Sequence, residues 1–80
     1  MAKQFEATDE VLTHRAAFGR RLSALRREAG LTQTALAAAA GMDRSFYVDV
    51  EHARHSVSVD RLFMIAKVLG VPAYRFFTED

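Results

Sequence analysis

The side chains best suited to contacting a nucleic acid lie between residues 32 and 56. Arg44 carries a planar guanidinium, which can donate two hydrogen bonds to O6 and N7 of one guanine. Gln33 is expected at the start of a helix, where free N–H groups and the helix dipole favour a phosphate. Double-stranded DNA is the partner that such donors would suit, provided that the surrounding segments place them on one surface. The predicted DNA-contacting residues are Thr32, Gln33, Asp43, Arg44, Ser45, Phe46, Val48, Asp49, Arg54, His55 and Ser56.

Two of these residues have alternative interpretations. Arg44 could instead contact a phosphate or form a salt bridge with Asp43 or Asp49. Asp49 is unusual for a DNA-facing position, because a carboxylate can accept from N4 of cytosine but repels phosphates. We favour the interpretation in which Asp49 holds Arg54 or Arg44 in place.

The apolar side chains of the same segment could also face DNA. Phe46 and Val48 could contact a thymine methyl group, or they could pack against the sugar edge. Arg54, His55 and Ser56 follow in an expected loop, where they could meet the phosphate backbone. If neither apolar residue contacts DNA, specificity depends on few groups and on the shape of the DNA.

Two short helices are needed to position these side chains, and the sequence predicts them over residues 33–40 and 44–52. Gly41 between them can adopt the positive φ that ends a helix without a Cβ clash. Asp43 is a good N-cap for the second helix, because its carboxylate can accept from free N–H groups of the first turn.

The spacing of small and apolar residues then indicates how the two helices cross. Ala37 on the first helix is small enough for a second helix to pass close over it. Tyr47 and Val50, three residues apart, point back toward the first helix. Two helices that cross steeply around a glycine turn form a helix-turn-helix, whose second helix enters the major groove of DNA.

The remaining segments also show helical periodicity and helix stop signals, with no strand pattern. An N-terminal arm or helix extension is expected over residues 1–12, followed by the helix-turn-helix domain over residues 13–80. Whether residues 9–12 continue the first helix is left open. We predict an all-α fold of five helices, at 13–29 (starting at Thr8 or Thr13), 33–40, 44–52, 58–69 and 72–77.

Three segments carry a resemblance to a known family: FGRRLSALRREAGLTQTALAAAAG, DRSFYVDVEHAR and VDRLFMIAKVLGV. From about Phe18 to Phe77 the chain resembles the Xre/Cro/C1-type helix-turn-helix family. The resemblance implies a five-helix lambda-repressor-like domain and a transcription regulator that binds a palindromic operator as a homodimer. Within the family, DRSFYVDVE is similar to the recognition helix of restriction–modification controller proteins.

The resemblance also implies structural roles for individual residues. Arg26 and Glu51 match the family's ion pair between the first helix and the end of the recognition helix. Ala53 stands where relatives usually have Gly, which suggests either strain or a different C-cap. His55 and Ser56 stand where controller proteins usually have an Arg-Asn pair.

A second apolar surface is expected on the last helices. Phe63, Met64, Val68 and Tyr74 occupy positions where an isolated monomer would carry polar residues, so we predict a dimer interface there. The alternative is a slightly larger monomer core. A different class of function is also open, namely a protein-interaction module of antitoxin or anti-repressor type that uses this surface.

The bulk properties limit the remaining possibilities. The chain has 80 residues, half of them apolar, and no cysteine, which indicates one folded domain compatible with a reducing cytoplasm. The net charge is only +1, but residues 14–61 carry eight arginines against five acidic residues, which gives +3. His52 and His55 lack a third ligand, and no catalytic constellation stands out. We therefore expect no enzyme activity, metal, cofactor, small-molecule ligand or membrane segment, and a cytoplasmic location.

Overall fold

The structure is a computed structural model that describes residues 6–78 and contains no β-strand within them. The predicted all-α fold is therefore confirmed for the described residues. The chain forms α1 (Asp9–Glu28), α2 (Gln33–Ala39), α3 (Arg44–Glu51), α4 (Val59–Leu69) and the 3₁₀ turn η1 (Ala73–Phe76).

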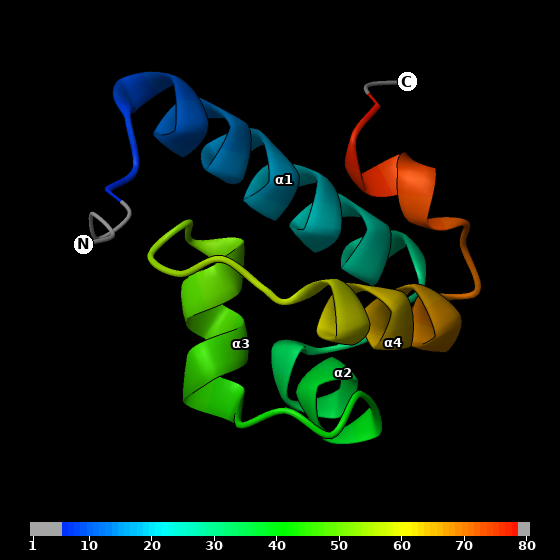
Figure 1. Ribbon diagram of the computed structural model, residues 1–80. Helices are drawn as coiled ribbons and strands as arrows, with labels where there is room; N and C mark the ends of the chain where they lie inside the picture. The colour runs from blue at the N-terminus through cyan, green and yellow to red at the C-terminus, as the bar shows by residue number, and fades with distance from the viewer. Residues whose placement is uncertain (1–5, 79–80) are drawn as a thin grey trace.

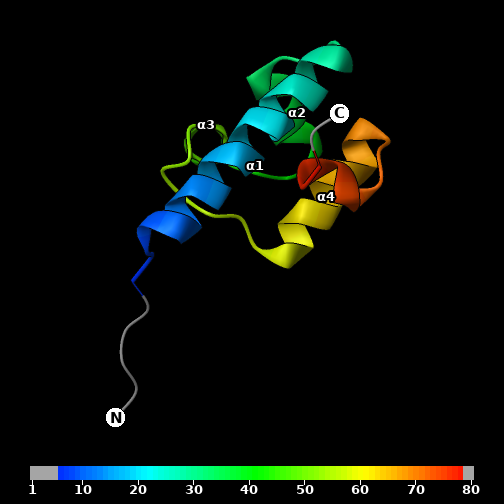
Figure 2. The same cartoon turned by 90° about the horizontal axis from the view of Figure 1, so that it is seen from above.

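The long helix α1 lies across the other elements (Figures 1 and 2). It contacts α3 and η1, while α2 contacts α3 and α4. In both views η1 and α3 lie at opposite sides of the molecule. The arrangement leaves one side of α3 free of other helices.

The helix α1 begins at Asp9 because Thr8 caps it, with its hydroxyl oxygen accepting from the Val11 N–H at 3.2 Å. Asp9 and Glu10 then place negative charge at the positive end of the helix dipole. Residues 9–12 are thus the first turn of one continuous helix, which answers the question that the sequence left open.

The helix-turn-helix has the Asp43 cap and the Gly41 turn that the sequence predicted, and α2 has a cap of its own. The Thr32 hydroxyl oxygen accepts from the Ala35 N–H at 3.0 Å and caps α2. The Asp43 carboxylate accepts from the Phe46 N–H at 3.1 Å and caps α3. Gly41 between the helices has a φ of 67°. Each helix ends one residue before its predicted end, because that residue takes the C-cap position instead.

The segment predicted as a fifth helix, residues 72–77, contains a single 3₁₀ turn, Ala73–Phe76, rather than an α-helix. Its bonds join residues three apart: the Arg75 N–H donates to the Pro72 carbonyl at 3.1 Å, and the Phe77 N–H donates to the Tyr74 carbonyl at 2.9 Å. Pro72 has an extended ψ of 146° and precedes the turn rather than opening a helix. Four residues are too few to establish an α-helical ladder after a proline, which supplies no N–H.

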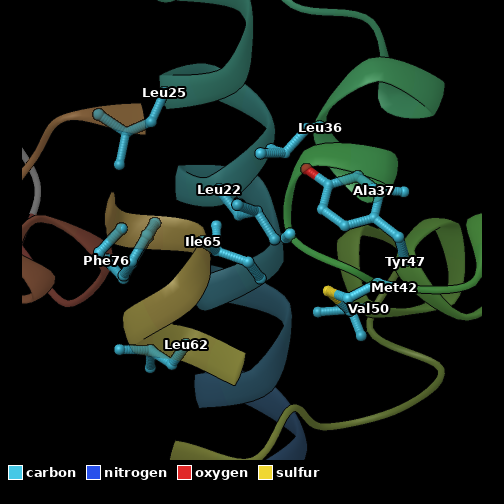
Figure 3. Close-up of a cluster of buried hydrophobic side chains, with 12 residues drawn as sticks. Leu22, Leu25, Leu36, Ala37, Met42, Tyr47, Val50, Leu62, Ile65 and Phe76 are labelled. Carbon is cyan, nitrogen blue, oxygen red and sulfur yellow. The ribbon is translucent and has the colours of Figure 1, made fainter. Parts of the chain in front are cut away.

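The core lies between α1, the helix-turn-helix and α4. Leu22 and Ile65 are fully buried at its centre, with Phe76 on one side and Tyr47 on the other (Figure 3). The ring of Phe18 lies 5.5 Å from that of Phe76 and extends the core under η1. Leu22, Ile65, Phe76 and Tyr47 come from four different elements, so their packing fixes the position of α3 relative to the rest.

One glycine sets the distance between α1 and α3. A Cβ atom on Gly19 would lie 2.3 Å from the carbonyl oxygen of Glu51, closer than real Cβ contacts. Gly19 is therefore required for the close approach of α1 to the C-terminal end of α3. This approach allows an α1 side chain to reach the carboxylate of Glu51.

Candidate nucleic-acid interface

The helix α3 has a buried face and an outward face. Tyr47, Val50 and Glu51 are buried. Arg44 and Ser45 are exposed at the N-terminal end of the outward face. Because the packing uses only one face, the other face can meet a partner without any rearrangement of the core.

The exposed Arg44 is held by a residue of the preceding helix. Its Nε donates to the hydroxyl oxygen of Thr34 at 3.0 Å. Neither suggested salt bridge forms, since Asp43 caps α3 and Asp49 pairs with Arg54. The terminal nitrogens of Arg44 have no partner among the described residues, so they can donate to an incoming acceptor.

Asp49 belongs to a cluster at the C-terminal half of the outward face. Its carboxylate lies 3.0 Å from Nη1 of Arg54 and 3.8 Å from Nε2 of His55. The His55 ring also stacks on Phe46, with the ring centroids 5.6 Å apart. The negative charge of Asp49 is thus balanced by the arginine, and Phe46 is covered on one side. Val48 is half-buried on the same helix.

The segment after α3 has the strain that the sequence suggested at Ala53. The Ala53 N–H donates to the Val50 carbonyl at 3.2 Å, and the Arg54 N–H donates to the Asp49 carbonyl at 2.8 Å. This pair of bonds is a Schellman C-cap, in which the residue at the Ala53 position is usually Gly. Ala53 has a φ of 63°, in the left-handed region that an L side chain disfavours.

A buried network fixes α3 from the inside, and its centre is the Glu51 carboxylate. It accepts from Nε of Arg26 at 2.6 Å, from the hydroxyl group of Tyr47 at 2.5 Å and from Nε2 of Gln33 at 3.0 Å. Arg26 also donates to the carbonyl of Leu31 at 2.8 Å. The network connects α1, α2 and α3 through one side chain.

The network also controls the ionisation of its members. Burial by itself would raise the pKa of the Glu51 carboxyl, but the hydrogen bonds from Arg26, Tyr47 and Gln33 outweigh burial and hold this pKa below its ordinary value of 4.5. Burial and the hydrogen bond to Glu51 raise the pKa of the Tyr47 hydroxyl above 10.0. At neutral pH the carboxyl is therefore ionised and the phenol is protonated.

Gln33 takes part in this network as well as lying at the first position of α2. Its side chain is half-buried, and one amide N–H is used by Glu51. The second N–H of the same amide group remains for another acceptor. Thr32, Arg54, His55 and Ser56 are exposed. Their contacts with DNA stay predictions.

The residues predicted as a dimer interface differ in exposure. Phe63, Met64 and Tyr74 are exposed, with fractions of 58%, 48% and 63%. Val68 is half-buried and packs against the core. The exposed part of this apolar surface consists of the first three residues.

The histidines near α3 point to different partners. His52 Nδ1 lies 3.4 Å from Nη1 of Arg54, and His55 lies beside Asp49. The neighbouring Glu51 is buried and paired with Arg26. Residues 6–78 contain no group of three or more potential metal ligands. Within the same range, no helix is both long and apolar enough to cross a membrane.

Three residues that organise the site were not predicted as site residues from the sequence. Thr34 supports Arg44, Gly19 admits α3 close to α1, and the Tyr47 hydroxyl group contacts Glu51. Only Gly19 leaves a signal in the sequence, since a glycine inside a helix costs about 1 kcal/mol and commonly marks close packing.

Comparison with known proteins gives a consistent result. Residues 22–76 match a family described as helix-turn-helix. The immunity repressor protein of Bacillus phage phi105 is 40% identical over 62 residues, which cover 78% of this chain and 43% of the repressor. The chain therefore spans less than half the length of that relative.

Solved structures resemble this arrangement of helices over most of the chain. The restriction-modification controller protein C.AhdI from Aeromonas hydrophila has a TM-score of 0.79 and 34% identity, with 81% of this chain and 98% of that chain covered. The clp gene regulator ClgR from Corynebacterium glutamicum has a TM-score of 0.77 and 26% identity, with 80% and 68% covered. The similarity thus extends from the fold to the sequence.

Proposed function

The chain belongs to the Xre/Cro/C1-type helix-turn-helix family, and we propose that it is a sequence-specific DNA-binding transcription regulator that acts as a homodimer on a palindromic operator. The observation that carries this proposal is the outward face of α3. It presents Arg44 and Ser45 to the solvent while the opposite face is fixed by the core and by the Glu51 network.

Arg44 is the proposed base-reading residue. Its Nε is bound to Thr34, so the side chain is oriented before DNA arrives. Its terminal nitrogens can then donate to O6 and N7 of guanine, a contact that discriminates against other bases by about 1–3 kcal/mol. Because Thr34 already holds the side chain, the guanidinium needs little further ordering on binding.

Phosphate contacts on both sides of α3 would position it in the groove. Gln33 at the start of α2 has one amide N–H left for a phosphate, beside the free N–H groups of that helix end. Arg54, His55 and Ser56 lie exposed after the opposite end of α3. Contacts of this kind set register and orientation without reading sequence.

Dimerisation is proposed through the exposed apolar surface of Phe63, Met64 and Tyr74. This surface belongs to α4 and η1, and η1 lies at the opposite side of the molecule from α3. A two-fold dimer joined there leaves both α3 helices free. Their recognition helices would face half-sites roughly 34 Å apart on one side of the duplex.

The alternative is a protein-interaction module of antitoxin or anti-repressor type. Asp49 would favour that alternative if it were unpaired, because a carboxylate repels the phosphates of DNA. Its pairing with Arg54 and its approach to His55 remove much of that repulsion. The geometry therefore favours the DNA-binding proposal.

The proposal is tested by selecting bound duplexes from a random-sequence pool and titrating the selected site by fluorescence anisotropy. We expect a dissociation constant of roughly 10⁻⁸–10⁻¹¹ M at physiological salt, with affinity falling as salt rises. Arg44→Ala should weaken the selected site by about 1–3 kcal/mol and affect non-specific binding much less. Absence of any sequence-preferring complex would favour the interaction module.

The oligomeric part is tested by sedimentation. Met64→Glu places a charge in the proposed interface and should shift the protein toward monomer. Val59→Glu is the control, because it places the same charge at an exposed apolar residue at the start of the same helix. If both variants sediment as the wild type does, the proposed interface is wrong.

A further inference from the structure

A basic cleft opens beside the C-terminal end of α3, between that end, α1 and the start of α2. It has a volume of about 530 Å³, and its lining includes Arg20, Ser23, Arg27, Gln33 and His52. None of the α1 residues in this lining belongs to the predicted DNA contacts. The cleft therefore extends beyond the surface described above.

The α1 side of the cleft carries two available positive charges. Arg20 and Arg27 are seven residues apart, so they lie on one face of the helix, with Ser23 between them. Both arginines are exposed, and neither forms an ion pair with any acidic residue in the range that the structure describes. Two guanidinium groups and a hydroxyl group offer donors of the kind that bind a phosphate.

The acidic residue in the cleft wall does not cancel these charges. Glu51 is buried, and its carboxylate already accepts from Arg26, Tyr47 and Gln33. Its charge is balanced by Arg26 in the same network. The local charge that an approaching group meets is therefore that of Arg20 and Arg27.

The cleft is continuous with the outward face of α3. His52 follows Ser45 by seven residues and Asp49 by three, so it lies on the same stripe of the helix. His52 also lines the cleft, together with the α1 arginines. The backbone of a duplex that lies along the outward face of α3 would therefore lie close to the α1 side of the cleft.

We propose that this cleft is a further phosphate-binding site, in which Arg20, Ser23 and Arg27 hold a phosphodiester of the DNA next to the bases read by α3. The inference rests on the proposed DNA-binding function. It assigns to α1 a direct part in contacting DNA, in addition to its packing role. The same chemistry would also accept free inorganic phosphate, so the experiment must separate the two sources.

The test uses the selected duplex and the Arg20→Gln/Arg27→Gln variant. The slope of log K against log salt should become shallower by about 0.9 for each phosphate that the variant no longer neutralises. Arg15→Gln is the control, because Arg15 lies on α1 but lines a separate pocket with Phe18 and Phe77. We expect the control to retain the wild-type slope. Equal slopes for the wild type and the double variant would overturn the inference.

A scan with neutral methylphosphonate linkages identifies the phosphate. Among the linkages whose neutralisation weakens binding by the wild type, one per half-site should have no effect on binding by the double variant. A general loss of positive charge would instead reduce the effect at every linkage alike, and that result would overturn the site. The far-UV circular dichroism of both proteins should be identical, because both arginines are exposed.

Titration of the free protein with inorganic phosphate at constant ionic strength, followed by NMR of α1, separates the two sources. Saturable binding that the double variant loses, together with no linkage-specific effect, would assign the cleft to free phosphate and overturn the DNA assignment. A wild-type protein that binds no selected duplex would contradict the proposed function itself. If the wild type binds the selected duplex and the double variant binds it in the same way, only this inference is contradicted.

Discussion

Replacing Glu51 by glutamine should destabilise the protein more than any other isosteric change in the molecule's polar network. The Glu51 carboxylate accepts from Arg26, Tyr47 and Gln33, and its exposed fraction is only 8%. Glutamine keeps the shape but removes the charge, and its NH₂ group would face donors rather than acceptors. Arg26, 9% exposed, would then be a buried cation without a counter-ion.

The magnitude follows from the loss of one partner of a buried pair, which costs about 3–5 kcal/mol. A domain of this size has a free energy of unfolding of about 5–15 kcal/mol in total. Glu51→Gln should therefore remove a large share of the stability. The loss is measured from urea denaturation followed by far-UV circular dichroism at pH 7.

The pH dependence gives a second measurement. The folded pKa of Glu51 is lowered, so its contribution to stability is fully present above its ordinary value of 4.5 and is lost as the pH falls below that value. The glutamine variant has no such group to protonate. The difference in unfolding free energy between the two proteins should therefore shrink as the pH is lowered from 7 to 3.

A matched control is Glu28→Gln, because Glu28 carries an exposed carboxylate at the end of α1. Its effect should stay within about 0.5 kcal/mol. A Glu51→Gln loss below about 1 kcal/mol, or a loss that is the same at pH 7 and pH 3, would refute the reasoning. Either result would mean that the ion pair is not what holds α3 to α1.

Three further predictions concern single positions. Ala53→Gly should stabilise the protein by about 0.5–1 kcal/mol. The relief of left-handed strain, about 1–2 kcal/mol, exceeds the effect of the added entropy of the unfolded chain, about 0.4–1 kcal/mol. An unchanged urea midpoint would show that Ala53 is unstrained. Gly19→Ala should destabilise by about 1–3 kcal/mol through its contact with the Glu51 carbonyl, and a neutral result in the same assay would contradict the close approach. Thr34→Val should weaken the selected DNA site two- to fivefold, equivalent to about 0.5–1 kcal/mol, while Thr34→Ser retains affinity; equal titration curves for the two variants would exclude support of Arg44 by Thr34.

The helix boundaries were predictable because their causes are local. Thr32 and Asp43 cap the helices that directly follow them, and Gly41 supplies the positive φ of the turn between those helices. Each feature involves residues within a few positions of one another. The same local reasoning failed after Pro72, where the backbone bonds join residues three apart and the segment is a 3₁₀ turn rather than an α-helix.

The partners of the site residues were less predictable, because they depend on distances between elements. Thr34 lies ten residues before Arg44, and Gln33 lies 18 residues before Glu51. Only the crossing of the helices brings each pair together. The ion pair of Arg26 with Glu51 was suggested by family resemblance, whereas nothing in the spacing of residues indicated it. The assigned contacts with DNA remain predictions.

The separation of α3 into an anchored face and an outward face has a consequence for how such regulators diverge. Tyr47, Val50 and Glu51 carry the attachment of the helix, so changes at Arg44 and Ser45 leave that attachment intact. Exposed substitutions of this kind usually alter stability by no more than about 0.5 kcal/mol. If Arg44 and Ser45 read DNA as proposed, two copies of the gene could acquire different DNA preferences after a duplication, because no single step would unfold the protein.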